Sequence, residues 1–287
     1  MLLVNPIVLS SIIERALLED LGEQGCITSQ LIFSNEEVSQ GTFLSKSSGI
    51  LAGGPVLERL FQMVDPSVKI TRLLPDGTPL SPGRRFCSVE GPVISLLTAE
   101  RTALNLLQRM SGIATLAHTF KEKISNFPKV KIVDTRKTTP GLRVLEKYAV
   151  RVGGGFNHRF GLFDTIMIKD NHIKAAGGIR QAIEKVRLQI GHTTKVEVEV
   201  EDMIGAVEAA RAGADIVMLD NMAPEMMRRC VEKLAGNVTV EASGGINLDT
   251  IGAVVKSGID CISIGALTHS AKALDLSFDI GEAAEEQ

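Results

Sequence analysis

From residue 128 onward the chain alternates short apolar segments with helical ones, and this rhythm limits its fold more than any other feature. The strand candidates cover residues 130–135, 165–169, 195–200, 214–220, 238–243 and 261–266. The segments between them have helical patterns, and several close on a glycine, as helices commonly do. A strand–helix unit that recurs every ~20–35 residues indicates a run of βα units with a parallel sheet.

About six βα units fit into this part of the chain, fewer than the eight of a complete (β/α)₈ barrel. We therefore expect an α/β protein with an incomplete α/β barrel. An open doubly wound sheet is the alternative. It would usually carry a glycine-rich dinucleotide-binding turn after its first strand, and the segment after 130–135 has none.

The first hundred residues are less regular and predict a smaller α+β sandwich. Strand candidates at 38–45, 68–74 and 85–90 are separated by glycine and proline turn signals. A helical segment at 55–64 lies between them, and Thr98 is a candidate N-cap for the next helix.

The domain boundaries follow from this change of pattern. We place an N-terminal sandwich domain at 1–115 and the barrel, which is the catalytic domain, at 116–269. Residues 272–280 alternate like one more strand that pairs outside the barrel. The C-terminal segment 270–287 is therefore assigned to the N-terminal domain.

Composition narrows the class of protein. Hydrophobic residues make up 44% of the chain and aromatic residues only 4%, which fits a core of buried parallel strands. The net charge of −3, without a lysine–arginine block, argues against a nucleic-acid partner. The four cysteines have no metal-ligand spacing, and no apolar run reaches membrane-span length, so we expect a cytoplasmic protein.

Polar or glycine residues stand at the end of every predicted barrel strand. In a βα barrel these carboxyl ends meet on one face, where catalytic residues lie. The residues are Asp134 and Thr135, Lys169 to Asn171, Glu197, Glu199 and Glu201, Asp220 and Asn221, Glu241 to Gly245, and Gly265 to His269. We expect them to form one active site.

The segment KVEVEVE (195–201) places valines on one face of a strand and glutamates on the other. We expect the valines to meet the helices and the glutamates to point into the barrel; an exposed edge strand is the alternative. Carboxylates inside a barrel need cations, and Lys137, Lys169 or a divalent ion are candidate partners.

Two further features concern ligands. Ser243, Gly244 and Gly245 lie between a strand and a helix, and with Gly265 they predict a phosphate-binding turn. The segment NHRFGLFDTIMIKDNH (157–172) places charged residues on both sides of an apolar run. For both groups to reach one ligand, the loop before the strand must fold back over the barrel mouth.

The sequence resembles the quinolinate phosphoribosyltransferase family over nearly its whole length. The segments that carry the resemblance are ALLEDLG, ERTALNLLQRMSGIAT (100–115), DTRKTTPGLRVLEKYAV (134–150), GGGFNHRFGLFDTIMIKDNH (153–172), VEVEVE, MLDNM, EASGGI and IGALTHSAKALDLSFDI. The resemblance implies a two-domain homodimer, sometimes further assembled, in which the N-terminal part of one subunit closes the barrel of the other. The implied reaction joins quinolinate to phosphoribosyl pyrophosphate with Mg²⁺, and gives nicotinate mononucleotide, pyrophosphate and CO₂ for NAD biosynthesis.

The resemblance also implies a role for each matched residue. Arg101 would reach quinolinate from the neighbouring subunit, and Lys137 would face the phosphoribosyl donor. The residues implied to hold the two carboxylates of quinolinate are Arg136, His158, Arg159 and Lys169. Glu199 and Asp220 would bind the ribose hydroxyls and the metal; Glu199 is chosen because its distance to Asp220 fits the family spacing. The residues implied to surround a phosphate are Ser243, Gly244, Gly245, Gly265 and His269.

One position departs from the family, because Cys26 stands where an aspartate usually precedes the Ile-Thr pair. Three other functions remain open from the residues themselves. They are a phosphate-binding aldolase-type barrel in which Lys169 forms a Schiff base, a paralogue of this fold family linked to molybdenum uptake, and a non-catalytic nucleotide-binding module.

Overall fold

The computed structural model describes residues 4–234 and 236–281, which form two compact units. One unit contains the chain up to residue 118, residues 139–154 and the chain from residue 270. The other contains residues 119–138 and 155–269. The segment 139–154, which the sequence analysis placed in the barrel, packs with the first unit. The ends of the predicted sandwich domain, 1–3 and 282–287, lie outside the described residues.

The first unit is built on a four-stranded antiparallel sheet with the order β12-β1-β5-β3. Its strands are β1 (Val38–Ser45), β3 (Lys69–Leu73), β5 (Arg85–Pro92) and β12 (Leu276–Ile280). Phe43 on β1 lies opposite Phe278 on β12, with ring centroids 4.6 Å apart. The prediction that the C-terminal strand pairs back with the N-terminal domain is confirmed.

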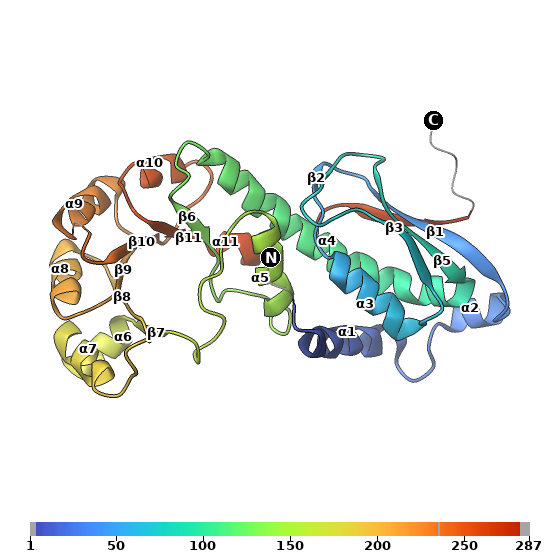
Figure 1. Ribbon diagram of the computed structural model, residues 1–287, viewed down its shortest axis with the longest axis horizontal. Helices are drawn as coiled ribbons and strands as arrows, with labels where there is room; N and C mark the ends of the chain where they lie inside the picture. Colours follow the sequence, from blue (N-terminus) through green and yellow to red (C-terminus); the bar gives the residue numbers. More distant parts are fainter. Residues whose placement is uncertain (1–3, 235, 282–287) are drawn as a thin grey trace. The chain divides into compact units, whose positions relative to one another are not determined.

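Helices α3 (Gly54–Val64) and α4 (Val93–Lys123) run along one face of this sheet (Figure 1). The unit also contains α1 (Pro6–Leu21), α2 (Ile27–Ile32) and α5 (Arg143–Val152), and β2 (Gly49–Ile50) and β4 (Pro79–Leu80) form a separate small ladder. Phe61 of α3 packs edge-on against Phe43 of the sheet, with ring centroids 6.2 Å apart. A hydrophobic face of α3 is thus buried on the strands, as its sequence pattern predicts.

The predicted start of the long helix at Thr98 is wrong, because α4 begins at Val93, directly after β5. The backbone N–H of Val93 donates to the carbonyl of Glu37 at 2.9 Å. A backbone carbonyl therefore accepts a hydrogen bond at the helix start, where a capping side chain would otherwise be expected. Leu96 is already fully buried, so the apolar face of α4 also starts before Thr98.

The second unit contains a six-stranded parallel sheet with the order β6-β11-β10-β9-β8-β7. Its strands are β6 (Lys131–Val133), β7 (Ile166–Ile168), β8 (Val196–Val200), β9 (Ile216–Asp220), β10 (Thr239–Ser243) and β11 (Cys261–Ser263). The first strand pairs with the last, as in a barrel, while β6 and β7 are not paired with each other. The predicted incomplete α/β barrel is confirmed.

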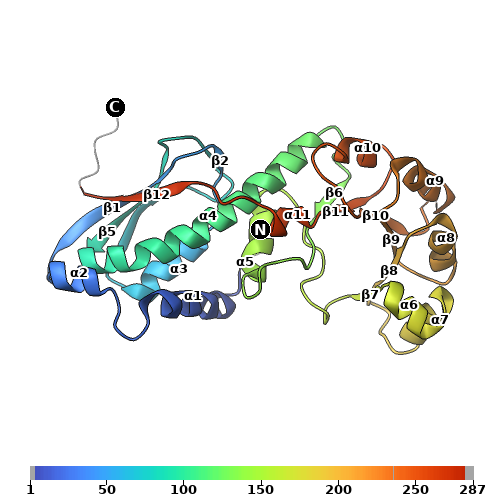
Figure 2. The ribbon, with the colours of Figure 1, turned by 180° about the vertical axis from the view of Figure 1, so that it is seen from behind.

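Helices α7 to α10 follow one another along the outside of this sheet (Figures 1 and 2). The helices of the unit are α6 (Asp170–Ala176), α7 (Ile179–Arg187), α8 (Met203–Arg211), α9 (Pro224–Leu234), α10 (Ile251–Val255) and α11 (Ala266–His269). Val196, Val198 and Val200 of β8 are buried, as the alternating pattern predicts. The alternate residues of β8 are therefore left for the inner face of the sheet.

The loop before β7 lies along the free edge of β6. Phe156 forms a parallel bridge with Val133; its N–H donates to Ile132 at 2.8 Å, and its carbonyl accepts from the N–H of Asp134 at 3.1 Å. The loop is thus held to β6 by backbone pairing, while its folding over the barrel mouth stays a prediction. The next residues of the chain, Asn157 to Arg159, are carried to the end of β6.

Candidate active site

Asp134, at the end of β6, fixes the segment that follows Phe156. It is fully buried, and its carboxylate accepts a hydrogen bond from the backbone N–H of His158 at 2.9 Å. Its second oxygen accepts from the side-chain amide of Asn157 at 2.6 Å. Both oxygens are thus used within the protein, so the role of Asp134 is to hold this segment at the strand end.

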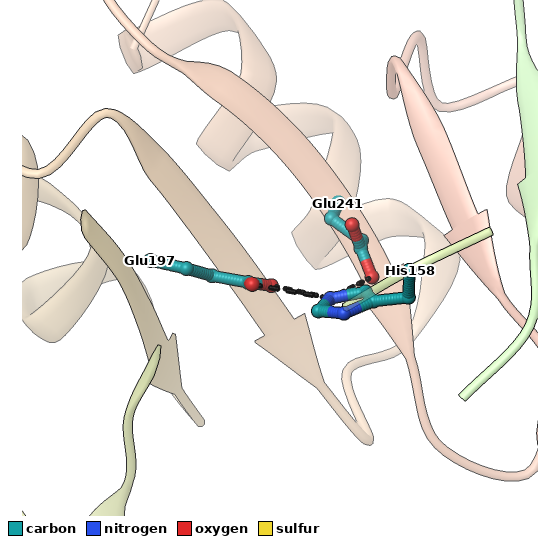
Figure 3. A group of neighbouring side chains, drawn as sticks. All are labelled: His158, Glu197 and Glu241. Carbon is teal, nitrogen blue, oxygen red and sulfur yellow. Dashed lines mark hydrogen bonds and ion pairs between the residues drawn. The ribbon is translucent and has the colours of Figure 1, made fainter. Parts of the chain in front are cut away.

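His158 lies between two buried glutamates, one on β8 and one on β10 (Figure 3). Its Nε2 is 3.1 Å from Glu197 on β8 and 3.6 Å from Glu241 on β10. Its Nδ1 accepts a hydrogen bond from the backbone N–H of Arg159 at 2.8 Å. A neutral ring with its proton on Nε2, which points toward the glutamates, fits these contacts.

The burial of Glu241 raises its pKa to about 7, and the charge of Glu197 adds to this rise, while His158 and Ser263 act against it. Glu241 is only 4% exposed, and among the described residues no group donates a hydrogen bond to its Oε1. Sequence analysis placed Glu241 among the polar strand ends expected at the active site but gave it no role of its own. The signal was its position two residues before Ser243, which places both side chains on the same face of β10.

One histidine nitrogen and two carboxylates within 4.8 Å of one another also raise the question of a metal site. A histidine that binds a metal normally donates a hydrogen bond through its other ring nitrogen. In His158 that other nitrogen accepts a hydrogen bond, so Nε2 is a donor. The donor set His158, Glu197 and Glu241 does not fit a metal ion in this arrangement.

Lys169 and Glu199 form an ion pair at the ends of β7 and β8, in which the lysine ammonium donates to the carboxylate. This confirms one of the two lysine partners expected for the glutamates, while the partner of Glu197 is His158. Glu199 lies beside Met218 in the register, so Asp220 is the next residue of β9 on the same face.

Glu199 and Asp220 fit the ligand chemistry of Mg²⁺. They offer carboxylate oxygens on adjacent strands, and Mg²⁺ is commonly held by one or two carboxylates together with substrate phosphates. One oxygen of Asp220 accepts a hydrogen bond from the side-chain amide of Asn221 at 2.8 Å, and one oxygen of Glu199 is paired with Lys169. Each carboxylate has a second oxygen that a cation can bind.

Positive charge is concentrated around Arg159. Its pKa is lowered, first because the guanidinium is partly buried and next because of the charge of Arg136. Glu197, Asp164 and Glu199 act in the opposite direction. The Nη1 group of Arg159 donates to the carbonyl of Thr165 at 3.2 Å, which holds the side chain beside its own loop. Two arginines that repel each other favour an anionic ligand between them.

The glycine turns follow β10 and β11. Gly244 has φ +90°, and a Cβ on it would lie 2.2 Å from the side-chain oxygen of Asn221, so only glycine fits this turn. A Cβ on Gly265 would lie 3.0 Å from Lys137 and 3.2 Å from the ring of His269. The structure thus brings Lys137, Gly265 and His269 together, and Ser243 pairs with Asp220 in the sheet.

Arg101 belongs to the first unit, where it lies on α4 with its side chain 58% exposed. Its guanidinium is 3.8 Å from Glu100, the neighbouring residue. Its predicted role at the site of another subunit stays a prediction.

Comparison with known proteins decides the family. The model for the C-terminal domain of quinolinate phosphoribosyl transferase matches residues 113–279, and the model for its N-terminal domain matches residues 27–111. The chain belongs to the quinolinate phosphoribosyltransferase family. This membership favours phosphoribosyl transfer over a Schiff-base reaction at Lys169.

Relatives within the family are similar over nearly the full chain. A probable nicotinate-nucleotide pyrophosphorylase (carboxylating) of Bacillus subtilis is 45% identical and aligns 96% of this chain with 95% of its own. The crystal structure of NadC from Streptococcus pyogenes is 42% identical, with a TM-score of 0.93 over 97% of this chain and 98% of that one. The nicotinate-nucleotide pyrophosphorylase of Francisella tularensis is 40% identical, with a TM-score of 0.91 and the same coverage.

Across residues 4–234 and 236–281, no helix is both long enough and apolar enough to cross a bilayer.

Proposed function

We propose that this protein transfers the phosphoribosyl group of phosphoribosyl pyrophosphate to quinolinate and decarboxylates the product. The products are nicotinate mononucleotide, pyrophosphate and CO₂, in the biosynthesis of NAD. The observation that carries the proposal is that arginines and carboxylates occur together in the unit that contains the parallel sheet. The mutually repelling Arg136 and Arg159 lie in the same unit as the carboxylates Glu199 and Asp220, which end adjacent strands.

The cations bind the acidic substrate. Quinolinate carries two carboxylates, and a guanidinium can bind two carboxylate oxygens at once. Arg136 and Arg159 bind these groups, and Lys169, at the end of β7, supplies a third positive charge. Binding of the dianion removes the repulsion between the two arginines, so their arrangement favours the ligand.

The carboxylates act on the donor. As pyrophosphate leaves, the ribose C1 becomes positively charged, and Glu199 and Asp220 stabilise that charge. When bound by these two residues, Mg²⁺ neutralises charge on the phosphates. Lys137 lies beside Gly265 and His269, where it can pair with a phosphate group at the glycine turns.

Decarboxylation needs little beyond orientation. After the pyridine nitrogen has bonded to ribose C1, the ring carries a positive charge. This charge stabilises the electron pair that remains at ring carbon 2 when the adjacent carboxylate leaves as CO₂, and a proton from water then bonds to that carbon. The chain therefore needs no general base for this step.

We further propose a homodimer in which Arg101 of one subunit reaches the quinolinate site of the other. Its exposed side chain on α4 supports this role. We place the enzyme in the cytoplasm, because its four cysteines are free, which suits a reducing compartment.

The test is to incubate the purified chain with quinolinate, phosphoribosyl pyrophosphate and Mg²⁺, and to follow nicotinate mononucleotide by chromatography. We expect product only when all three are present. The molybdenum-linked paralogue would give no product with quinolinate. The aldolase alternative would give none either, but borohydride would trap a carbonyl substrate on Lys169.

A further inference from the structure

The resemblance predicts that His158 binds a carboxylate of quinolinate, but both nitrogens of its ring are engaged within the protein. Nε2 faces Glu197 at 3.1 Å and Glu241 at 3.6 Å, and Nδ1 accepts the N–H of Arg159 at 2.8 Å. The side chain of His158 is only 12% exposed. These contacts hold the ring of His158 in one position inside the barrel, and we call a residue held in this way an anchor.

We propose that Glu197 and Glu241 are positioning residues of the quinolinate site, which anchor a neutral His158 and thereby aim the guanidinium of Arg159. This inference rests on the proposed function, because it assigns the groups that orient one of its substrate-binding arginines. The substrate contact is made by Arg159, and the glutamates act through the histidine.

The first argument is mechanical. The segment 155–159 is a loop, and its single bridge to the sheet is at Phe156. Beyond that bridge, Asp134 holds the backbone of His158, Glu197 accepts a hydrogen bond from its ring, and Glu241 lies 3.6 Å from the same nitrogen. The N–H of Arg159 is then bonded to that ring, so the contact continues to the arginine backbone. Groups that bind substrate must be held to within about 0.5 Å by such supporting contacts.

The second argument is electrostatic. Partial burial and the charge of Arg136 both work against the charged form of Arg159, and Glu197 is the largest opposing influence. Burial, and next the charge of Glu197, raise the pKa of Glu241. The carboxylate of Glu197 therefore favours the charged form of Arg159.

Two substitutions at His158 separate an anchor from a cationic ligand. In His158→Gln the side-chain amide N–H reaches about as far as Nε2, whereas in His158→Asn the side chain ends near the position of Nδ1. If His158 is an anchor, His158→Asn should raise the Kd of quinolinate by about tenfold or more, because a misplaced Arg159 costs affinity. The same role predicts a rise of less than about threefold for Gln, because the hydrogen bond to Glu197 is retained.

Isothermal titration calorimetry with quinolinate alone measures these constants, and Glu184→Gln, at an exposed position on the outer helix α7, is the control. The variants Glu197→Leu and Glu241→Leu should raise the KM for quinolinate but not that for phosphoribosyl pyrophosphate. Glu241→Gln should raise the KM for quinolinate much less than Glu241→Leu does. The proposal would be overturned if His158→Gln and His158→Asn raised the Kd of quinolinate equally. It would also be overturned if neither variant raised that Kd.

A spectroscopic measurement tests the anchor without any substrate. In ¹⁵N-histidine-labelled protein, the signal of His158 is assigned among the five histidines by its loss in His158→Gln. We expect the neutral ring with the proton on Nε2 near neutral pH; an imidazolium signal would overturn the inference. If the wild type shows the neutral ring but binds no quinolinate, the proposed function fails while the anchor stands.

Discussion

Single residues on the inner face of the barrel sheet are matched in charge. Glu199 is paired with Lys169, Glu197 faces the Nε2 proton of His158, and burial favours the protonated form of Glu241. A buried carboxylate without such a partner would cost several kcal/mol. Arg159 is close enough to Arg136 for the charge of Arg136 to lower its pKa, and such a pair of guanidinium groups favours an anionic ligand.

The first residue-scale prediction concerns Arg136→Ala. A charge-assisted hydrogen bond contributes about 1.5–3 kcal/mol, so the KM for quinolinate should rise by about ten- to a hundredfold. The KM for phosphoribosyl pyrophosphate should change much less. Steady-state kinetics measures both, and Arg180→Ala on the outer helix α7 serves as the control. Unchanged kinetics would remove Arg136 from the site.

The second residue-scale prediction concerns Glu241 and the pH dependence of the unfolding free energy. Its pKa rises from 4.5 to about 7 on folding, so between these values the folded state binds more protons than the unfolded state. The stability of the wild type should therefore fall as pH rises through this window. Between about pH 5 and pH 8, the fall in unfolding free energy should be smaller in Glu241→Gln than in the wild type, by on the order of 1–3 kcal/mol.

Urea unfolding at both pH values measures this difference. Glu201→Gln, which replaces an exposed carboxylate near the same strand, should follow the wild type. The same loss of stability in Glu241→Gln and in the wild type would contradict the buried acid.

Secondary-structure elements were largely predictable, because their signals are local. The alternation of KVEVEVE identifies β8 and assigns its two faces, and the strand at 38–45 has the predicted bounds. The start of α4 at Val93 was not predictable, because the partner of its first N–H is Glu37, far away in sequence. The contact of His158 with Glu197 and Glu241 was not predicted for the same reason, although all three were expected near the site, since three distant segments form it.

The prediction at the scale of an element concerns α2. Cys26 is its N-cap, and the side chain makes no capping hydrogen bond to the helix backbone. Cys26→Asp restores the usual family residue, whose carboxylate can accept a hydrogen bond from the first turn. We expect a gain in unfolding free energy of about 0.5–2 kcal/mol, measured by urea denaturation. The control Cys26→Ala should give no gain; equal stability of both variants would show that the cap plays no part.

The whole molecule combines distant parts of the chain in each unit. The C-terminal strand β12 completes the sheet of the first unit, and the first barrel strand, β6, pairs with the last, β11. Most of the proposed site lies in the second unit, whereas Arg101 lies in the first. The proposed dimer therefore predicts that each active site uses residues of two subunits.

Mixing two inactive variants tests this sharing. Arg101→Ala and Lys169→Ala each disable one part of the site, so each homodimer should have little activity. After subunit exchange, a hybrid dimer has one site with both residues intact, and about a quarter of wild-type activity is expected when half of the dimers are hybrids. No recovery, with exchange verified by differently tagged chains, would argue against shared sites.

The most direct measurement follows the carboxylate that leaves. Quinolinate labelled with ¹⁴C in its 2-carboxyl group is incubated with the enzyme, phosphoribosyl pyrophosphate and Mg²⁺. A decarboxylating phosphoribosyltransferase should release one labelled CO₂ for each unlabelled nicotinate mononucleotide, and none without the donor. Labelled CO₂ in the absence of phosphoribosyl pyrophosphate, or no turnover with all components present, would contradict the proposed reaction.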